Sequence, residues 1–499
     1  MEPDDPRAVV RSATAPAGWE NPIAAARYDL VVLGGGAAGL VCAAGAAGLG
    51  ARVALVERAR LGGECLHTGC VPSKALLRAA RAAAEIRRGR DLGVSTAGEP
   101  IVDYSAVVGR VRRVQAELCG NDSAERFQKM GVDLFFGEAR FAGPEAIEVG
   151  NQRLRFRRAV ICTGSRPHVP EIPGLESGDL LTSETVLDRA ELPRSLLIVG
   201  GGATGCEMAQ AFARLGSRVI LVESADRILP REDPDASRLL HTALEREGVV
   251  VMTGREVQSA RREGGGWTVE LDGAEATNRP NVDEIFLATG RRPNVETLHL
   301  AAASVETNAH TGVTVDDFLR TANPRIYAAG DVCTLDRYAH TADAMARIVL
   351  RNAFFFGRLR MSRLPRPRCV YTSPEIAQIG LTEGEAAALG RRCRVVTQPL
   401  AVVDRAVIDG AADGVLKLIL DARSERLLGA TLICDQATAL LPALGLLLRT
   451  KAKVSTLGAA GLAYPTLAGV FGKITDGLLR ERLTRPVRWL LRQRFRWLR

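Results

Sequence analysis

Several features that would define a specialised class of protein are missing from this sequence. The 499-residue chain starts with the acidic stretch MEPDD and lacks the basic start and apolar stretch of a signal peptide. Its longest apolar runs, residues 30–50 and 437–448, are broken by glycines or too short to span a bilayer. Ten cysteines are scattered without a His/Cys set at zinc spacing, and they are too sparse for a disulfide-stapled secreted domain. These absences predict a cytoplasmic protein without a bound metal.

A basic surface is also missing from most of the chain. The formal net charge is +9, but residues 480–499 hold eight Arg and one Glu, a local charge of +7. The remaining 479 residues therefore carry only about +2. Because the basic character belongs to the tail, nucleic-acid binding by the body of the protein is not predicted.

The sequence pattern of the body repeats once. A buried-strand pattern at 28–33 runs into GGGAAGL, a small-residue helix and a second strand at 51–57. About 165 residues later the same order recurs, with a strand at 195–199, GGGATG, a helix at 206–215 and a strand at 218–223. The length predicts two to four domains, and two βαβ units at this spacing predict two nucleotide-binding domains.

The first glycine motif has the spacing of a pyrophosphate-binding turn. Gly34, Gly36 and Gly39 form G-x-G-x-x-G between a strand and a helix. Glycines there permit a tight turn and the approach of a pyrophosphate to the helix N-terminus. Glu57 ends the next strand, where a carboxylate can bind an adenosine ribose. The motif alone is weak, but its strand and helix context predicts nucleotide binding.

The second glycine motif, Gly200, Gly202 and Gly205, is followed by Glu223 at the end of its second strand. A carboxylate at this position favours a free 2′-hydroxyl and repels a 2′-phosphate, which predicts NADH in preference to NADPH. Arg227 is close enough in sequence to weaken this prediction, and Glu223 could instead be a solvated residue at a strand end.

The strongest chemical pattern is GGECLHTGCVPSK at residues 62–74. Four residues separate Cys65 from Cys70, which allows the two cysteines to reach disulfide geometry. Cys70 precedes Pro72 and an Ala/Arg-rich stretch, so we expect it at a helix N-terminus, where the helix dipole favours a thiolate. Lys74, one turn further on, can hold an anionic partner. The alternative is a structural disulfide or two buried thiols, but structural disulfides are rare in the cytosol.

These motifs together resemble a known family. GGECLHTGCVPSK, the paired glycine motifs, the turns CTGSRP and ATGRRP, IYAAGDV and YTSPEIAQIG are similar to segments of the class I pyridine nucleotide–disulfide oxidoreductases. That family includes dihydrolipoamide dehydrogenase, glutathione reductase and mercuric reductase, and the resemblance covers roughly residues 28–480. It implies FAD and NAD(P)H as cofactors and a head-to-tail homodimer whose C-terminal domain completes the partner's active site. The implied activity passes electrons from a nicotinamide nucleotide, through flavin, to Cys65 and Cys70 and on to a small-molecule acceptor.

The resemblance also implies an α/β fold with two Rossmann-like domains, one for FAD and one for NAD(P), each with the three-layer ββα arrangement. A C-terminal α+β dimerisation domain is implied to follow them. The expected boundaries are 1–27 for a loose N-terminal extension, 28–165 for the FAD domain, 166–290 for the NAD(P) domain, 291–360 for the return to the FAD domain, 361–480 for the dimerisation domain and 481–499 for a basic amphipathic tail.

The family's residue roles carry over position by position. Cys70 is implied to be the charge-transfer thiol against the flavin, and Cys65 the thiol that exchanges with substrate. Lys74 is implied to lie near the flavin N5, paired with Glu207, which also belongs to the NAD(P) site. The remaining implied cofactor ligands are Thr163, Gly164, Asp331 and Ala339 for FAD and Gly290 for NAD(P).

One segment departs from the disulfide reductases of the family. These enzymes carry a His-Pro-Thr-x-x-x-Glu-like stretch, whose His is the acid/base for the dithiol and whose Glu orients it. Here residues 462–469 read LAYPTLAG, with Tyr464 at the His position and Gly469 at the Glu position. A tyrosine titrates near ~10 and is a poor base at neutral pH, so lipoamide and glutathione disulfide are not expected as substrates.

Mercuric reductases also place a Tyr there, and residues 210–217 and 346–355 are similar to theirs. However, residues 435–499 contain no counterpart of the cysteine pair that receives the metal in those enzymes. The prediction is a mercuric-reductase-like enzyme. A dihydrolipoamide-dehydrogenase-type or quinone reductase, or a membrane-tethered flavoprotein with little turnover, stays open. His67, which replaces the usual Asn, is either a local acid/base or a helix-flanking residue.

The tail, TRPVRWLLRQRFRWLR at 484–499, predicts a helix that starts at Pro486. On a 3.6-residue period one face holds Val487, Leu490, Leu491, Phe495 and Leu498, and the other holds Arg488, Arg492, Arg496 and Arg499, while Trp489 breaks the pattern. This pattern is typical of a helix bound at an anionic membrane surface, which would place the protein at the inner face of a membrane. A helix packed on the surface of the dimer is equally consistent with it.

Overall fold

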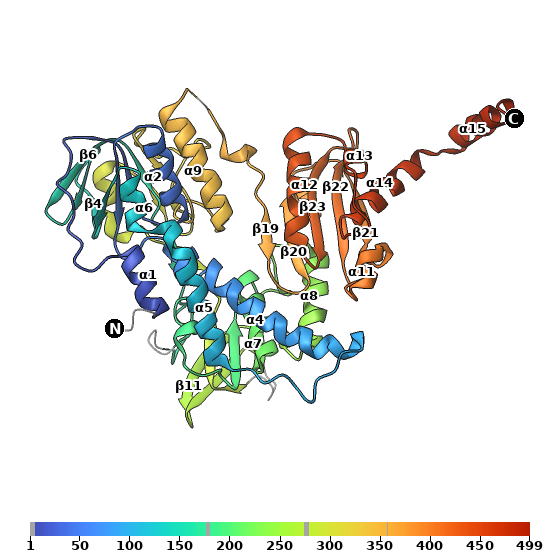
Figure 1. The fold of residues 1–499 in the computed structure, drawn as a ribbon, viewed down its shortest axis with the longest axis horizontal. Helices are drawn as coiled ribbons and strands as arrows, with labels where there is room; N and C mark the ends of the chain where they lie inside the picture. Colours follow the sequence, from blue (N-terminus) through green and yellow to red (C-terminus); the bar gives the residue numbers. More distant parts are fainter. Residues whose placement is uncertain (1–4, 176–179, 274–278, 357) are drawn as a thin grey trace. The chain divides into compact units, whose positions relative to one another are not determined.

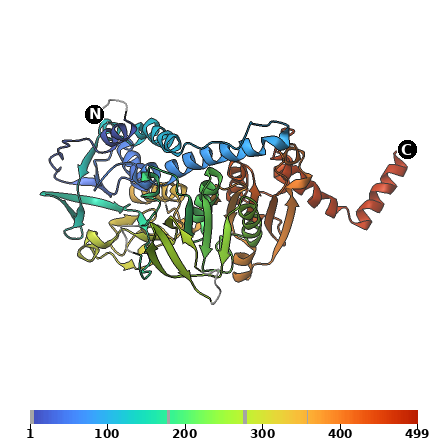
Figure 2. The ribbon, with the colours of Figure 1, turned by 90° about the horizontal axis from the view of Figure 1, so that it is seen from below.

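The computed structural model describes residues 5–175, 180–273, 279–356 and 358–499. The chain forms two compact units, shown in Figure 1 and, from below, in Figure 2. The first unit comprises Met1–Gly200, Met208–Ser224 and Arg255–Leu364, and the second comprises Gly201–Glu207, Ala225–Gly254 and Pro365–Arg499.

The first unit is built on a mostly parallel sheet in the order β3-β2-β1-β6, with β18 also paired to β6. Its strands are β1 (Tyr28–Leu33), β2 (Val53–Glu57), β3 (Val132–Phe136), β6 (Gln152–Ile161) and β18 (Ile326–Ala328). The antiparallel strands β5 (Ala146–Val149) and β4 (Ala139–Phe141) extend the sheet from β6. This α/β arrangement is the one expected for the first nucleotide-binding domain.

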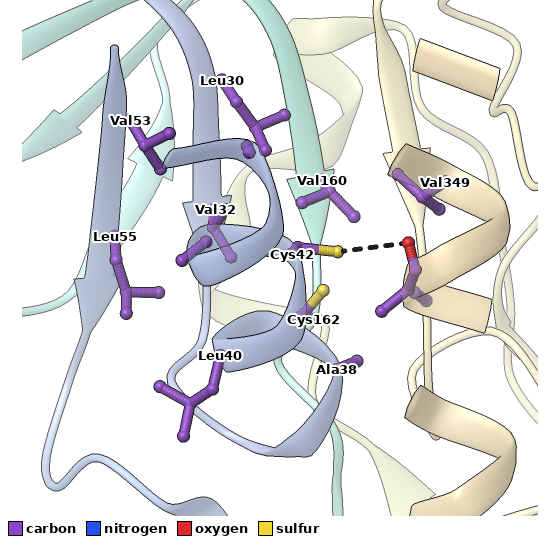
Figure 3. Packing of buried hydrophobic residues seen from close by; sticks show 14 of the residues in the cluster. Leu30, Val32, Ala38, Leu40, Cys42, Val53, Leu55, Val160, Cys162 and Val349 are labelled. Atoms are coloured by element: carbon purple, nitrogen blue, oxygen red, sulfur yellow. Dashed lines mark hydrogen bonds between the residues drawn. The ribbon is translucent and has the colours of Figure 1, made fainter. Parts of the chain in front are cut away.

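Both faces of this sheet are covered, which explains the continuous apolar run in β1. Leu30 and Val32 belong to the core beneath α2 (Ala37–Gly48) and α9 (Ala339–Phe354), as Figure 3 shows. Val31 and Leu33 belong to a second core on the opposite face. A strand buried on both sides has no polar alternation, as parallel sheets require.

The helix α1 (Pro6–Thr14) precedes the first strand. The side chain of Asp5 accepts the backbone N–H of Arg7, and a proline opens the helix, so the local sequence starts it well. α1 packs against α5 (Tyr104–Leu118) within the same unit. The expectation of a loose extension over residues 1–27 was therefore wrong for this segment, because its apolar face finds a partner far away in the sequence.

The second βαβ unit forms as the repeated pattern predicts. β8 (Ser195–Val199) pairs in parallel with β9 (Arg218–Glu223) and with β14 (Glu284–Leu287). α7 (Ala203–Leu215) follows β8 and begins three residues earlier than the predicted helix. Within the first unit, β11 (Val257–Glu263), β12 (Gly266–Leu271) and β13 (Asn281–Val282) form an antiparallel sheet, and β15 (Arg291–Pro293) pairs with β7 (Ser165–Pro167).

The second unit contains a five-stranded antiparallel sheet in the order β19-β20-β23-β22-β21. These strands are β19 (Arg368–Val370), β20 (Glu375–Gly380), β21 (Cys393–Pro399), β22 (Val415–Asp421) and β23 (Leu427–Cys434). The helices of this unit include α8 (Pro234–Arg246), α10 (Glu383–Ala388), α11 (Asp404–Ile408), α12 (Ala437–Thr450), α13 (Ser455–Gly458), α14 (Gly469–Arg482) and α15 (Arg485–Trp497). The structure thus confirms the mixed α+β region expected after residue 361.

Candidate active site

The first glycine turn is shaped by close backbone contacts. Gly34 has a φ of +101°, and a Cβ there would lie 2.4 Å from the carbonyl oxygen of Cys162. A Cβ on Gly39 would lie 1.8 Å from the carbonyl oxygen of Gly34. Only glycine fits at either position, because any side chain would force the helix away from the strand.

The N-terminus of α2 has no side-chain cap. Its first residue follows Gly36. A Cβ on Gly36 would lie 3.7 Å from the Cα of Gly63, which is an ordinary van der Waals contact. The first amides of a helix need acceptors from elsewhere, and a pyrophosphate supplies them together with a charge that suits the helix dipole.

Glu57 has a structural partner on each carboxylate oxygen. One oxygen accepts the N–H of Gly35 at 2.7 Å, and the other accepts the N–H of Ala59 at 2.8 Å. The carboxylate therefore links the end of β2 to the glycine turn and holds both backbones in place. Its predicted contact with a ribose stays a prediction.

The turn at Thr163 and Gly164 is held by a single asparagine. The Thr163 hydroxyl donates to the carbonyl of Asn294 at 2.7 Å, and the Asn294 side chain donates to the carbonyl of Thr163 at 2.9 Å. The backbone N–H of Asn294 also donates to the carbonyl of Gly164 at 3.0 Å. Asn294 was not singled out from the sequence, although it directly follows the second of the two similar turns, ATGRRP.

The cysteine motif folds into two consecutive helices. Cys65 lies in α3 (Gly63–His67), and Cys70 is the first residue of α4 (Cys70–Arg88), a long helix drawn in blue in Figure 2. This confirms that Cys70 begins a helix. Cys70 is exposed, whereas Cys65 is half-buried.

The two cysteine thiols lie in hydrogen-bonding contact. This hydrogen bond to Cys70, together with burial, raises the pKa of the Cys65 thiol, while the positive charge of Lys74 opposes the shift. A thiol pair in contact can exchange with a disulfide or bind a soft cation, provided that one member ionises. Cys70 is exposed at a helix N-terminus, where the helix dipole favours an anion.

The surrounding residues hold the cysteine motif in place. The side-chain amide of Gln115 in α5 donates to the carbonyls of Leu66 and His67, both at 2.8 Å. Leu66 is buried in one cluster with Val10 of α1 and with Cys119, so the N-terminal helix packs against the cysteine motif. This support was not visible in the sequence.

His67 ends α3 and is bound to its surroundings. Its Nε2 lies 2.8 Å from the carbonyl oxygen of Leu61 and can donate a hydrogen bond to it. Burial lowers the pKa of the His67 imidazole. A neutral ring committed to a backbone carbonyl fits the helix-flanking interpretation better than that of an acid/base.

Asp331 is part of a polar network that the sequence did not reveal. The Ser165 hydroxyl donates to Asp331 at 2.7 Å, and the Arg291 Nε donates to that same hydroxyl at 2.7 Å. Arg291 also forms an ion pair with Glu64, the residue directly before Cys65. Burial raises the pKa of the Glu64 carboxyl, and Arg291 opposes this rise. The network thus connects a predicted FAD ligand to the cysteine motif.

The second glycine turn repeats the geometry of the first. Gly200 has a φ of +106°, and a Cβ there would lie 2.5 Å from the carbonyl oxygen of Ala288. Around Gly202 no atom lies within 4 Å of the position of a Cβ, which leaves room for a ligand. Gly205 lies inside α7, and Gly290, with a φ of +98°, directly precedes β15.

The residues after β9 bear on the choice of nucleotide. Glu223 ends β9 and is largely buried, with Ser224 donating to its carboxylate at 3.3 Å. The Arg227 guanidinium donates to three backbone carbonyls of its own loop, at Leu229, Pro230 and Glu232, over 2.8–3.1 Å. These bonds use three of the five N–H donors of the guanidinium.

Glu207 and Tyr464 lie in the second unit. Glu207 is 5% exposed, and its carboxylate accepts the backbone N–H of Tyr371 at 2.9 Å. Because Lys74 belongs to the first unit, the pairing of Lys74 with Glu207 stays a prediction. Ala339 is the first residue of α9, whose N-terminus has no side-chain cap.

Tyr464 is 80% exposed and has a carboxylate partner that the sequence did not indicate. Its hydroxyl donates to Asp404, the first residue of α11, at 2.9 Å. This hydrogen bond raises the pKa of the Tyr464 hydroxyl. Gly469 begins α14 and offers no side chain in place of the orienting Glu.

Among the described residues, no cluster of His, Cys, Asp and Glu has the composition and spacing of a metal site. No helix in the described ranges has the length and apolar character needed to cross a bilayer.

Comparison with known proteins places these features in context. Residues 28–347 match the family described as "Pyridine nucleotide-disulphide oxidoreductase", and residues 366–474 match the dimerisation domain of that family. The chain is 33% identical to the mercuric reductase of Lysinibacillus sphaericus, over 88% of this chain and 81% of that protein. It is 36% identical to the dihydrolipoyl dehydrogenase of Thermus scotoductus, over 88% of this chain and 95% of that protein.

Two solved structures have the same fold. The HOCl-induced flavoprotein disulfide reductase from Escherichia coli has a TM-score of 0.80 and 28% identity, covering 90% of this chain and 99% of that chain. LpdA from Mycobacterium tuberculosis has a TM-score of 0.82 and 25% identity, with the same coverage.

Proposed function

Because the chain belongs to the pyridine nucleotide–disulphide oxidoreductase family, whose members depend on FAD and NAD(P)H, we propose that it passes two electrons from NADH to the Cys65–Cys70 pair. The acceptor that we propose is a soft cation bound to thiolates, of the Hg(II) type. The observation that carries the proposal is the contact between the two thiols, with Cys70 exposed at the start of α4. In the first half-reaction, NADH, one proton and the disulfide give NAD⁺ and two thiols, and bound FAD supplies the two-electron relay.

The residues of the first unit fit a flavin dinucleotide. The uncapped N-terminus of α2 would hold the pyrophosphate. Glu57 would bind the adenosine ribose, and the Thr163–Gly164 turn and Asp331 would contact the rest of the cofactor. Asp331 is suited to this because Ser165 and Arg291 fix its carboxylate.

The second glycine turn supports NADH as the electron donor. The room around Gly202 suits a pyrophosphate, and Glu223 at the end of β9 suits the two hydroxyls of an unmodified ribose. Because Arg227 is close to Glu223 in the sequence, it weakened the prediction of NADH over NADPH. Its three bonds to loop carbonyls support the view that it does not serve as a phosphate ligand.

The proton balance favours a soft cation over a disulfide as the acceptor. When a disulfide substrate is cleaved, the departing thiolate needs an acid, and the reverse reaction needs a base. The hydrogen bond to Asp404 raises the pKa of the Tyr464 hydroxyl, so it is a weak acid and is not available as a base at neutral pH, and His67 is bound to a backbone carbonyl; neither is suited to this task.

The transfer of Hg(II) needs no such group. If Hg(II) arrives bound to two small thiolates, Cys65 and Cys70 release two protons as they bind the metal, and the departing thiolates take them up. Two Hg–S bonds form and two break in this exchange. The bound Hg(II) would then gain two electrons and leave as Hg(0), while the two Cys thiolates lose two electrons and form the disulfide again. The similarity to mercuric reductase supports this acceptor class.

The dimerisation domain supports a homodimer, and Tyr464 lies within its matched range. We propose that Tyr464 of the partner subunit completes the site around the cysteine pair. Its protonated hydroxyl would then be a donor or a neutral ligand rather than a base. A cytoplasmic location remains a prediction.

An anaerobic titration with NADH tests the role of the cysteines. Two-electron reduction of the FAD-loaded protein is expected to give a long-wavelength absorption band from a Cys70 thiolate beside the flavin. Cys70→Ala should abolish the band, Cys65→Ala should show it without reductant, and Cys393→Ala, a half-buried cysteine outside the motif, should behave like the wild type. A reduced wild type without the band would refute the proposal.

A panel of acceptors tests the substrate class. With NADH in excess, Hg(II)–dithiol complexes, quinones, lipoamide and glutathione disulfide are compared on the wild type, and the NADH oxidised is measured. Hg(II) complexes should be reduced at least about tenfold faster than either disulfide, equivalent to about 1.4 kcal/mol of transition-state preference. Faster reduction of quinones would reassign the acceptor, whereas rapid reduction of lipoamide would overturn the argument from Tyr464.

A further inference from the structure

The C-terminal helix α15 buries none of its residues. In both ribbon views it lies away from the five-stranded sheet of its own unit, joined only through α14 (Figure 1). Trp489 and Leu490 are each 60% exposed, and Trp497 is 84% exposed. Large apolar side chains in water cost free energy, so a helix that exposes this many of them is suited to burial against a partner.

The charge of this helix is of one sign. Residues 484–499 contain six arginines, at positions 485, 488, 492, 494, 496 and 499, and no acidic residue. Within the described part of the chain these arginines form no ion pair, and Arg488 donates only to the backbone carbonyl of Leu483, at 2.7 Å. The partner of α15 must therefore accept both apolar side chains and a high density of positive charge.

The two kinds of residue are largely segregated around the helix. At 100° per residue, Arg485, Arg488, Arg492, Arg496 and Arg499 fall within one arc, and Val487, Leu490, Leu491, Trp497 and Leu498 fall opposite. Phe495 lies at the boundary between the two arcs. Trp489 falls on the side of the arginines, and Arg494 falls within the apolar arc. Trp residues and long Arg side chains are tolerated at a membrane interface, where the guanidinium can reach water along an apolar surface.

We propose that α15 docks on an anionic phospholipid surface, with its axis in the plane of the membrane and its apolar arc among the headgroups. Thirteen residues span roughly 20 Å as a helix, too short to cross a bilayer. The helix also begins after residue 474, where the match to the dimerisation domain ends. A second copy of α15 is a poor partner, because it would bring two sets of six arginines together.

Vesicle co-sedimentation of the full chain tests the proposal. The wild type should pellet with vesicles of phosphatidylcholine and phosphatidylserine at low salt, should pellet much less at high salt, and should stay in solution with pure phosphatidylcholine. Leu490→Glu with Phe495→Glu should weaken binding roughly tenfold or more, and so should Arg488→Glu with Arg492→Glu.

Matched control variants carry the same changes elsewhere on the surface. Leu92→Glu with Leu389→Glu replaces two exposed leucines, and Arg391→Glu with Arg392→Glu reverses two exposed arginines. Both should bind vesicles like the wild type. All variants should keep the wild-type rate of flavin reduction by NADH in solution, which separates this inference from the proposed function.

Three results would overturn the inference. The first is a wild type that stays in solution with anionic vesicles, and the second is equal binding by the Leu490/Phe495 variant and the wild type. The third is salt-sensitive binding to duplex DNA that needs the arginines but not the apolar residues, since this would make α15 a polyanion-binding helix. A tail-dependent change in oligomeric state without vesicle binding would assign its partner as a second copy of the chain.

Discussion

The two glycine turns of this protein have almost the same backbone but lead to different chemistry. Gly34 and Gly200 have φ values of +101° and +106°. In each turn a backbone carbonyl oxygen lies close to the position that a Cβ would occupy, at 2.4 Å for Gly34 and 2.5 Å for Gly200. The glycine pattern therefore determines the turn in both copies. What each copy does depends on the residues that follow its second strand.

After the first copy, the chain enters the cysteine motif within eight residues of Glu57, and Glu64 of that motif is bound to Arg291. After the second copy, the chain forms a loop whose carbonyls occupy Arg227. A shared nucleotide-binding turn therefore carries little information about the reaction. The side chains placed next to it by the following loop carry that information.

The largest effect is expected from a change inside the first turn. Gly39→Ala would place a Cβ 1.8 Å from the carbonyl oxygen of Gly34, which α2 can relieve only by moving off β1. We expect destabilisation of ~3 kcal/mol or more and loss of bound flavin, measured as the thermal midpoint and the flavin absorbance.

Gly202→Ala is the matched control in the second turn, because no atom lies within 4 Å of its Cβ position. This variant should stay folded and keep its flavin, while its KM for NADH rises because the methyl group occupies space meant for the nucleotide. If Gly39→Ala is as stable as Gly202→Ala, the packing of the first turn is looser than described.

An intermediate effect is expected at the carboxylates that end the two second strands. Glu223→Ala should lower kcat/KM for NADH. The ratio of kcat/KM with NADPH to kcat/KM with NADH should rise about tenfold, which corresponds to ~1.4 kcal/mol of transition-state preference. Glu57→Ala should leave that ratio unchanged and instead weaken flavin retention, because it removes the bonds to Gly35 and Ala59. An unaltered ratio in Glu223→Ala would show that this carboxylate does not contact the ribose.

The smallest effect in absolute rate is expected at Tyr464, the residue that replaces the histidine of the family's disulfide reductases. A tyrosine is protonated from about pH 5.5 to 8, the range over which a histidine titrates, and the hydrogen bond to Asp404 raises the pKa of Tyr464 further. The rate of dihydrolipoamide oxidation by NAD⁺ in the wild type should therefore stay low and independent of pH over this range. Tyr464→His should introduce a base that is active when neutral. Its rate should therefore rise with pH through about 6.5.

Tyr464→Phe is the control for this experiment, because it removes the hydroxyl without adding a base. It should show no such pH-dependent rise. A wild type that already oxidises dihydrolipoamide as fast as Tyr464→His would mean that another group serves as the base.

Local patterns in the sequence were sufficient for most of the fold. The two βαβ units, the helix that begins at Cys70 and the C-terminal helix were all predicted, because strand burial, glycine turns and helix starts depend on residues close together in the chain. The N-terminal helix α1 was missed because the segment was judged without its partner α5.

The polar contacts of the candidate site were decided only by the tertiary structure. Glu64 and Arg291 are 227 residues apart, and Tyr464 and Asp404 are 60 apart, so no local pattern connects them. The chain contains many arginines and carboxylates, and each could form an ion pair with many others. Packing of the sheets and helices selects the pairs that meet. The sequence by itself therefore determined where the cysteines and the turns lie, and the tertiary structure determined which charges and hydrogen bonds surround them.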